Sequence, residues 1–403
     1  MSHLQKRLEL MRYRPFLAYI IAFFTAAIGN GMGYIAITWI VVTYHTNVTA
    51  TAILMACFWG PTIICGPLTG VLADRLSRKK MILISNFSRA VIFIFFSFYL
   101  HYNDSSNVVY LLMLLNGFAF TLFYSSAMAF VRELIPAEKL MHANSTIDIM
   151  YEVGSVIGMG SAGFLIAITS SETAILINGI AFLIASISVF FIPKKALCHG
   201  SKSVPKKIRL WGDFYDGLHY LLKRKQLLSI YTIQLLIFIT FLTSPLLLVP
   251  FSKTVLNATV SQFGAIEAAA SVGIVIGGIL MPWLAEIAGL MRTLLFFSCT
   301  LCLTFCFFGW NHSIPLAILM YFIIGFSGAI WPLIITRAQS LTDLDFQGRV
   351  QSTFNSLSGT FMMGFYFFIG LIGHYFHIAS LYTVEVVITA IAIVFLVMAR
   401  KEF

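Results

Sequence analysis

The chain has 403 residues, of which 59% are hydrophobic and only 10% are charged, and its formal net charge is +10. A soluble globular domain carries about 25% charged residues, so this composition excludes a large soluble protein. Apolar runs of about 20 residues, the length that an α-helix needs to cross a bilayer, recur along nearly the whole chain. The sequence therefore predicts an all-α integral membrane protein.

The apolar runs predict twelve membrane spans. The first begins near Phe16 and is too long for the apolar region of a signal peptide, so we expect it to remain as a helix. The connections are short, apart from one central loop. The expected spans are residues 16–44, 50–73, 81–100, 108–131, 142–169, 173–192, 227–250, 261–285, 293–310, 315–336, 351–373 and 379–399.

The basic residues predict the orientation of these spans. If the N-terminus is cytoplasmic, every Lys and Arg except Lys253 and Arg89 falls in a cytoplasmic segment. This distribution obeys the positive-inside rule and predicts that both termini are cytoplasmic. It also explains the basic net charge without a nucleic acid partner. We expect a monomer in the inner (plasma) membrane, with the lipid bilayer as a partner.

The central loop divides the spans into two sets of six. We expect an N-terminal six-helix bundle over residues 1–192, a basic cytoplasmic linker over 193–226 and a C-terminal six-helix bundle over 227–403. Within the linker, residues 213–225 predict a short amphipathic helix on the inner membrane surface. Its apolar side is expected to consist of Phe214, Leu218, Leu221 and Leu222.

The two halves share a weak internal repeat. Residues 66–81 align with residues 278–293, which places Asp74 opposite Glu286. Residues 133–146 align in the same way with residues 340–353. The shared order and the near-equal offsets indicate a duplicated six-helix unit.

A glycine-containing, strongly charged segment joins the second and third spans. It reads Gly70-Val71-Leu72-Ala73-Asp74-Arg75-Leu76-Ser77-Arg78-Lys79. This segment resembles the loop 2–3 signature of the major facilitator superfamily, G-x-x-x-D-R-x-G-R-R/K, with serine in place of the usual second glycine. The resemblance extends over nearly the whole chain. It implies two pseudo-symmetric bundles of six helices that give alternating access to a site between them.

A second segment narrows the resemblance. Leu134-Ile135-Pro136-Ala137-Glu138-Lys139-Leu140-Met141-His142-Ala143-Asn144 is similar to the "LxPxxxLxxAN" stretch of the branch that holds macrolide exporters, the enterobactin exporter and a lysophospholipid transporter. Gln347-Gly348-Arg349-Val350 is typical of the same branch. This likeness leaves the substrate open.

The charged segment has a physical interpretation as a gate. The resemblance implies that Asp74 lies near the N-terminus of the eleventh span, where the helix dipole favours a carboxylate. Basic residues nearby would complete an ion-pair cluster that closes the cytoplasmic side; a purely topogenic role is the alternative. Gly66 and Gly70 are spaced for close helix packing. The expected gating residues are Gly70, Asp74, Arg75, Arg78, Glu286 and Arg349.

The fifth span carries two acidic residues within the apolar region. Asp148 and Glu152 are four residues apart and share a helix face. Glu152 lies roughly 16 Å into a core about 30 Å thick, at about 1.5 Å per residue. Arg89, on the third span, lies at a depth comparable to that of Asp148. We expect an Arg89–Asp148 ion pair that leaves Glu152 to bind a proton or another cation; a static structural network is the alternative.

Two further acidic residues lie toward the outer ends of later spans. Glu267 is a candidate for binding a proton or a cationic group, and Glu385 is expected to be structural. The resemblance implies that the first, fourth, seventh and tenth spans line a cavity. The residues expected to bind substrate there are Asn30, Tyr34, Asn116, Tyr124, Gln234 and Trp331.

Together these features predict a secondary transporter that is not an enzyme. We expect proton-coupled export of a small amphipathic molecule, either a drug such as a macrolide or a siderophore. An importer of a siderophore or another nutrient, and a lysophospholipid flippase, are alternatives on the same fold. The proton gradient is the expected driving force, with sodium as the other possible coupled ion. Cys299, Cys302 and Cys306 lie at helical spacing, but no His or acidic residue joins them, so buried free thiols are expected in place of a metal site, and no cofactor is expected.

Overall fold

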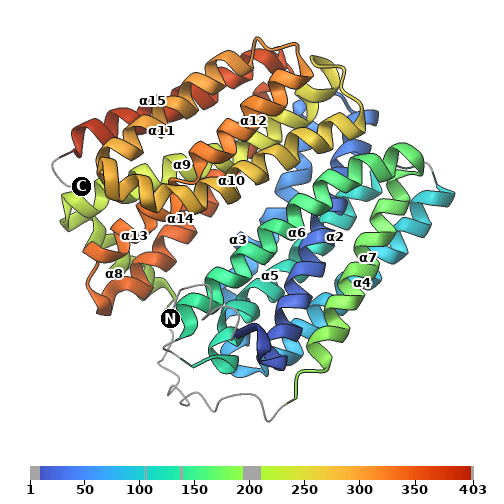
Figure 1. The fold of residues 1–403 in the computed structure, drawn as a ribbon, viewed down its shortest axis with the longest axis horizontal. Helices are drawn as coiled ribbons and strands as arrows, with labels where there is room; N and C mark the ends of the chain where they lie inside the picture. Colours follow the sequence, from blue (N-terminus) through green and yellow to red (C-terminus); the bar gives the residue numbers. More distant parts are fainter. Residues whose placement is uncertain (1–9, 104, 106, 137–138, 194–209, 401–403) are drawn as a thin grey trace. The chain divides into compact units, whose positions relative to one another are not determined.

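The computed structural model describes residues 10–103, 105, 107–136, 139–193 and 210–400, and these residues are entirely helical apart from turns and short connections (Figure 1). The helices are long because each contains an uninterrupted apolar run, and helical hydrogen bonding satisfies the backbone inside a membrane. Their bounds are α2 (Arg14–Tyr44), α3 (Val48–Arg75), α4 (Arg78–Tyr102), α5 (Val108–Leu134), α6 (Leu140–Ile168), α7 (Ser171–Phe190), α8 (Leu210–Lys223), α9 (Lys225–Thr254), α10 (Val260–Ala288), α11 (Leu290–Phe308), α12 (Ile314–Gly328), α13 (Trp331–Leu341), α14 (Leu344–Ile372) and α15 (Ile378–Met398).

Twelve stretches of the described residues are long and apolar enough to cross a membrane, and each overlaps one of the predicted spans. The expectation of twelve membrane helices is thus confirmed. The tenth span differs in detail, because two turn residues divide it into α12 and α13. Pro332 explains the break, since its missing N–H and its ring are incompatible with a helical hydrogen bond to Gly328.

The described helices form two compact units. Unit 1 comprises residues 1–44 and 57–206, and unit 2 comprises residues 45–56 and 207–403. The first part of α3 therefore groups with unit 2, where Thr49 Oγ1 donates a hydrogen bond to the Gly370 carbonyl at 2.7 Å. The domain boundaries at residues 192 and 227 stay predictions.

In unit 1, α2 packs along both α6 and α7 (Figure 1). The α2–α6 contact is close because glycines face the opposite backbone. A Cβ atom at Gly31 would lie 2.8 Å from the Ser155 carbonyl oxygen, and one at Gly158 would overlap the Ile28 carbonyl oxygen. Small residues of this kind are typical of membrane helix contacts.

Gly158→Ala should therefore destabilise unit 1. The added methyl group must displace the α2 backbone, and such overpacking costs about 1–3 kcal/mol. Gly278→Ala is the matched control, since a Cβ there meets no described atom within 4 Å. Thermal unfolding of the purified protein should show a lower Tm for Gly158→Ala alone. Equal Tm values for the two variants would disprove the close contact.

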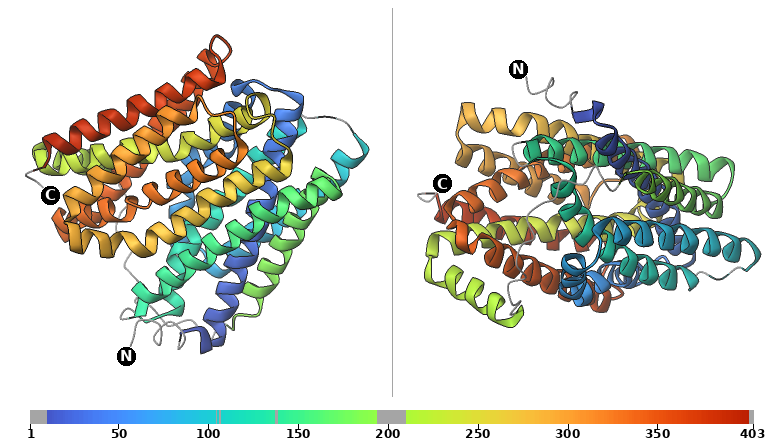
Figure 2. Two further views of the ribbon diagram at one scale, coloured as in Figure 1. Left: turned by 45° about the horizontal axis from the view of Figure 1, so that its top comes forward. Right: turned by 90° about the horizontal axis from the view of Figure 1, so that it is seen from below.

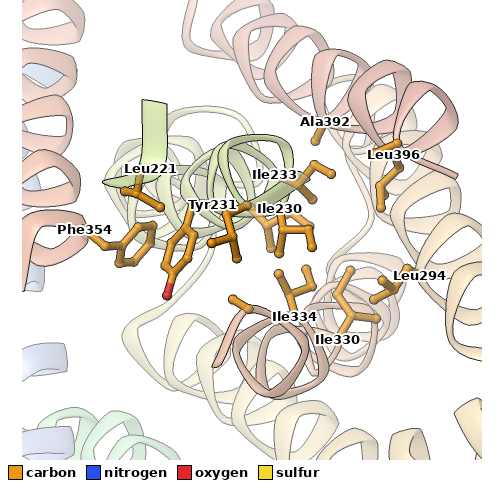
Figure 3. Close-up of a cluster of buried hydrophobic side chains, with 14 of the residues drawn as sticks. Leu221, Ile230, Tyr231, Ile233, Leu294, Ile330, Ile334, Phe354, Ala392 and Leu396 are labelled. Carbon is orange, nitrogen blue, oxygen red and sulfur yellow. The ribbon is translucent and has the colours of Figure 1, made fainter. Parts of the chain in front are cut away.

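In unit 2, α15 packs along α9 and α11 (Figure 2). A buried apolar cluster joins these helices to α8, α13 and α14 (Figure 3). Figure 3 shows Ile230 and Ile233 of α9 facing Leu294, Ile334 and Leu396 from three other helices. This cluster is the apolar core of the unit at the end nearest to α8.

The predicted linker helix is present as α8, but its contacts differ from the expected apolar side. Leu221 is buried, whereas Leu222 is 57% exposed, and the side chain of Phe214 lies outside the described residues. Tyr220 stacks on Phe346 of α14, with ring centroids 4.4 Å apart. The α8 helix therefore docks on the N-terminal end of α14 through Tyr220 and Leu221. Its place on the membrane surface stays a prediction.

Candidate functional site

A buried arginine lies at the centre of unit 1. The side chain of Arg89, on α4, is 0% exposed. Its Nε donates a hydrogen bond to Asn116 Oδ1 of α5 at 2.8 Å, and its Nη2 donates one to Asn30 Oδ1 of α2 at 2.6 Å. The guanidinium carbon lies 3.7 Å from the ring centroid of Phe182 on α7. One guanidinium group therefore contacts three other helices.

The third nitrogen of this guanidinium has no hydrogen-bond partner within the described part of the chain. Arg89 Nη1 is buried and unsatisfied, although its two neighbouring nitrogens are bonded. An unpaired charged donor is costly in a membrane interior, and the cation–π contact with Phe182 offsets only part of that cost. Arg89 Nη1 is therefore available to a hydrogen-bond acceptor on a ligand.

The expected ion pair between Arg89 and Asp148 is not formed among the described residues. The guanidinium bonds to two neutral amides, and Asp148 is on an exposed part of α6. The prediction relied on the depth of each residue along its helix. Depth does not define the direction in which a side chain points around the helix axis, so similar depths do not bring two side chains together.

The two acidic residues of α6 lie one turn apart and are close enough to interact electrostatically. The side chain of Glu152 is partly buried, and neither acid forms an ion pair or a hydrogen bond with another described residue. Tyr151 lies within electrostatic range of both Glu152 and Arg89. Tyr151 was not among the predicted residues, although its three-residue spacing from Asp148 places it near the same face.

A wall of aromatic rings adjoins the arginine and the acids. Phe120 stacks on Tyr124 with ring centroids 5.8 Å apart, and Phe58 and Trp59 of α3 lie 5.2 and 6.0 Å from Phe120. The guanidinium of Arg89 is 5.8 Å from the Phe120 ring. Tyr124 is 53% exposed and lies within electrostatic range of Asp148. Unit 1 thus combines an apolar aromatic surface with a hydrogen-bond donor, Arg89 Nη1, and two acids, Asp148 and Glu152.

Unit 2 places its two predicted substrate residues on neighbouring helices. Gln234 of α9 is buried, and neither atom of its amide group has a hydrogen-bond partner among the described residues. Trp331, at the first position after the break in the tenth span, stacks on Phe238 of α9 at 5.1 Å. A buried amide with unused donors and acceptors can bind a polar group of a ligand.

Comparison with known proteins now identifies the family. A sequence profile described as the Major Facilitator Superfamily matches residues 19–359. The chain belongs to this superfamily.

Individual relatives of the chain are distant in sequence. YfiS of Bacillus subtilis (strain 168), named as an uncharacterized MFS-type transporter, is 27% identical over 46% of this chain and 43% of its own length. YkuC of the same strain, another uncharacterized MFS-type transporter, is 23% identical over 55% of this chain and 53% of its own. The chain thus matches only about half the length of these two relatives.

Another relative matches the chain over most of its length. The multidrug efflux pump Tap of Mycolicibacterium fortuitum is 22% identical over 85% of each chain. A crystal structure of the nucleoside transporter NupG superposes with a TM-score of 0.73, covering 96% of this chain and 99% of NupG at 14% identity. This structural likeness confirms the major facilitator fold.

The structure describes part of the gate that was predicted from the sequence. Arg78 pairs with Glu133 of α5 at 3.1 Å, within unit 1. The surroundings of Gly70 and the side chains of Asp74 and Arg75 lie outside the described part of the chain, and their roles stay predictions. At Gly66 a Cβ atom would meet no described atom within 4 Å, so this glycine makes no close helix contact with the described residues of its own unit.

The second-half members of the predicted gate lie at helix ends. Arg349 of α14 pairs with Asp216 of α8 at 3.5 Å, a contact that was not predicted from the sequence. Glu286 is exposed near the end of α10. Its predicted role, like that of Arg349 in a cluster with Asp74, stays a prediction.

A polar cluster strengthens the docking of α8. Arg224 donates hydrogen bonds to Asp343 Oδ2 at 2.8 Å and to the Tyr220 hydroxyl at 2.5 Å. The backbone N–H of Asp343 donates to the same hydroxyl at 3.1 Å. The hydrogen bond from Arg224 lowers the pKa of the Asp343 carboxyl, and the Tyr220 hydroxyl lowers it further. These contacts hold the end of the linker against the segment that precedes α14.

Proposed function

We propose that this transporter exports a small amphipathic molecule in exchange for protons. The observation that carries the proposal is the arrangement in unit 1, where two acids that form no ion pair with a described residue adjoin an aromatic wall and a buried arginine. A charged carboxylate without a counter-ion is costly in a membrane interior, so Glu152 is suited to exchange a proton. The transporter works as a monomer in the plasma (inner) membrane, with the proton gradient as its driving force.

The same arrangement supports a substrate with a bulky apolar body and a few polar groups. Phe58, Trp59, Phe120 and Tyr124 offer apolar ring surface. Arg89 Nη1 offers one hydrogen-bond donor, and Asp148 and Glu152 offer negative charge to an amine. Such a mixture is typical of binding sites for drug-sized ligands. A drug such as a macrolide fits it, as does a siderophore, and the name of the relative Tap favours a drug.

The exchange follows because the substrate and the proton compete for Asp148 and Glu152 of α6. With Glu152 ionised, the two neighbouring carboxylates attract a cationic group of the substrate. A proton that binds Glu152 from the outer side reduces this negative charge and weakens the attraction, so the substrate leaves. Alternating access of the two units then carries the proton inward and returns the site to the cytoplasm.

Everted membrane vesicles test this proposal. Respiration should acidify their interior, and addition of a macrolide or a siderophore should discharge the pH gradient as a fluorescent pH indicator reports. Vesicles without the transporter are the control. Accumulation of labelled substrate without discharge would contradict proton coupling. Accumulation by intact cells in place of vesicles would contradict export.

A further inference from the structure

A fully buried carboxyl group lies in unit 2 and takes no part in the site of unit 1. Glu385, on α15, is 0% exposed. Its Oε1 lies 2.5 Å from Thr243 Oγ1 of α9, and its Oε2 has no hydrogen-bond partner in the described chain. No described Lys, Arg or His forms an ion pair with it. A structural role was expected for this residue from the sequence.

The surroundings of Thr243 indicate whether Thr243 or Glu385 donates the hydrogen in the contact between them. Thr243 Oγ1 also lies 2.9 Å from the carbonyl oxygen of Ile239, one turn earlier in α9. A hydroxyl group has a single hydrogen to donate, whereas a backbone carbonyl can only accept. If Thr243 donates to Ile239, the hydrogen between Thr243 and Glu385 must come from the carboxyl. A neutral Glu385 satisfies both contacts at once, and an ionised one cannot.

The other groups that face Glu385 do not supply a positive charge. Tyr321 of α12 and Tyr366 of α14 lie within electrostatic range of it, as does Tyr382 of α15. Glu267 of α10 faces two of these tyrosines, and from α11 the Cys302 thiol contacts the neighbouring Val386 carbonyl. Phenols, a thiol and a second acid cannot compensate a buried negative charge.

We propose that Glu385 is a second proton-binding site of this transporter, neutral in this conformation and controlled by its contact with Thr243. The helix that carries Thr243 lacks one backbone hydrogen bond close to this residue. Pro245 lies inside α9, two residues further on, and removes the helical hydrogen bond to the Phe241 carbonyl. A bend there separates Thr243 from Glu385 and admits water, which allows the carboxyl to ionise.

Infrared difference spectroscopy of the purified full-length protein tests this assignment. A protonated carboxyl has a carbonyl stretching band that shifts in D2O. Wild type should show this band at neutral pH, and Glu385→Gln should lose it. Glu172→Gln, in the partly exposed first turn of α7, is the matched control and should keep it. Spectra of Glu385→Gln and wild type that agree in this region would overturn the proposal.

Two further measurements test the proposal in case Glu385→Gln does not fold, and distinguish a proton site from a sodium site. Thr243→Val leaves the carboxyl in place but removes its acceptor, so the band should shift in frequency; an unshifted band would contradict control by Thr243. Sodium chloride should leave the band unchanged relative to choline chloride. Loss of the band in sodium would show a sodium site in place of a proton site. These readouts need no transport, so they are independent of the proposed exchange at Glu152.

Discussion

Arg89→Lys is expected to reduce transport at least tenfold, although the positive charge remains. The planar guanidinium bonds to Asn116 and Asn30 and stacks on Phe182, and an ammonium group cannot make all three contacts. Loss of one charge-assisted hydrogen bond costs about 1.5–3 kcal/mol. A tenfold change in an equilibrium constant corresponds to about 1.4 kcal/mol.

Substrate uptake into proteoliposomes, with equal amounts of folded protein, measures this effect. Arg292→Lys is the matched control, since Arg292 is exposed near the start of α11 and should tolerate the change. A single symmetrical peak in size-exclusion chromatography verifies folding before the assay. Wild-type transport by Arg89→Lys would show that the guanidinium only fills space.

The membrane helices were the most predictable feature of the chain. Each apolar run is long enough to cross a bilayer as a helix. Inside a membrane the backbone N–H and C=O groups must hydrogen-bond to each other, because no water is present. A run of this length therefore forms a helix whatever packs beside it. The break before Trp331 was also accessible in principle, because Pro332 and Gly328 lie at the spacing of one helical hydrogen bond.

The contacts between helices were much less predictable. The prediction placed Arg89 and Asp148 at similar depths but could not define how far each helix is rotated, and the pair does not form. Phe182 and Tyr151 contribute to the site through their positions in space, although a Phe or Tyr in an apolar run carries no distinguishing pattern. For the same reason the docking of Tyr220 on Phe346 could not be anticipated from an amphipathic helix alone.

Glu152→Gln is expected to uncouple substrate transport from protons. Glutamine has nearly the shape of a protonated glutamate, so the variant should resemble the proton-loaded state permanently. Because its side chain cannot ionise, it can no longer exchange a proton with either side of the membrane. Asp148 lies one turn nearer the start of α6, so it is not expected to replace Glu152 at its deeper position.

Substrate accumulation driven by an imposed pH gradient in proteoliposomes tests the central claim most directly. Wild type should accumulate substrate against its gradient, with a proton flux that a trapped pH indicator records. Glu152→Gln should show neither accumulation nor substrate-dependent proton flux, while Glu172→Gln should behave as wild type. Accumulation by Glu152→Gln with an unchanged pH dependence would contradict proton exchange at Glu152.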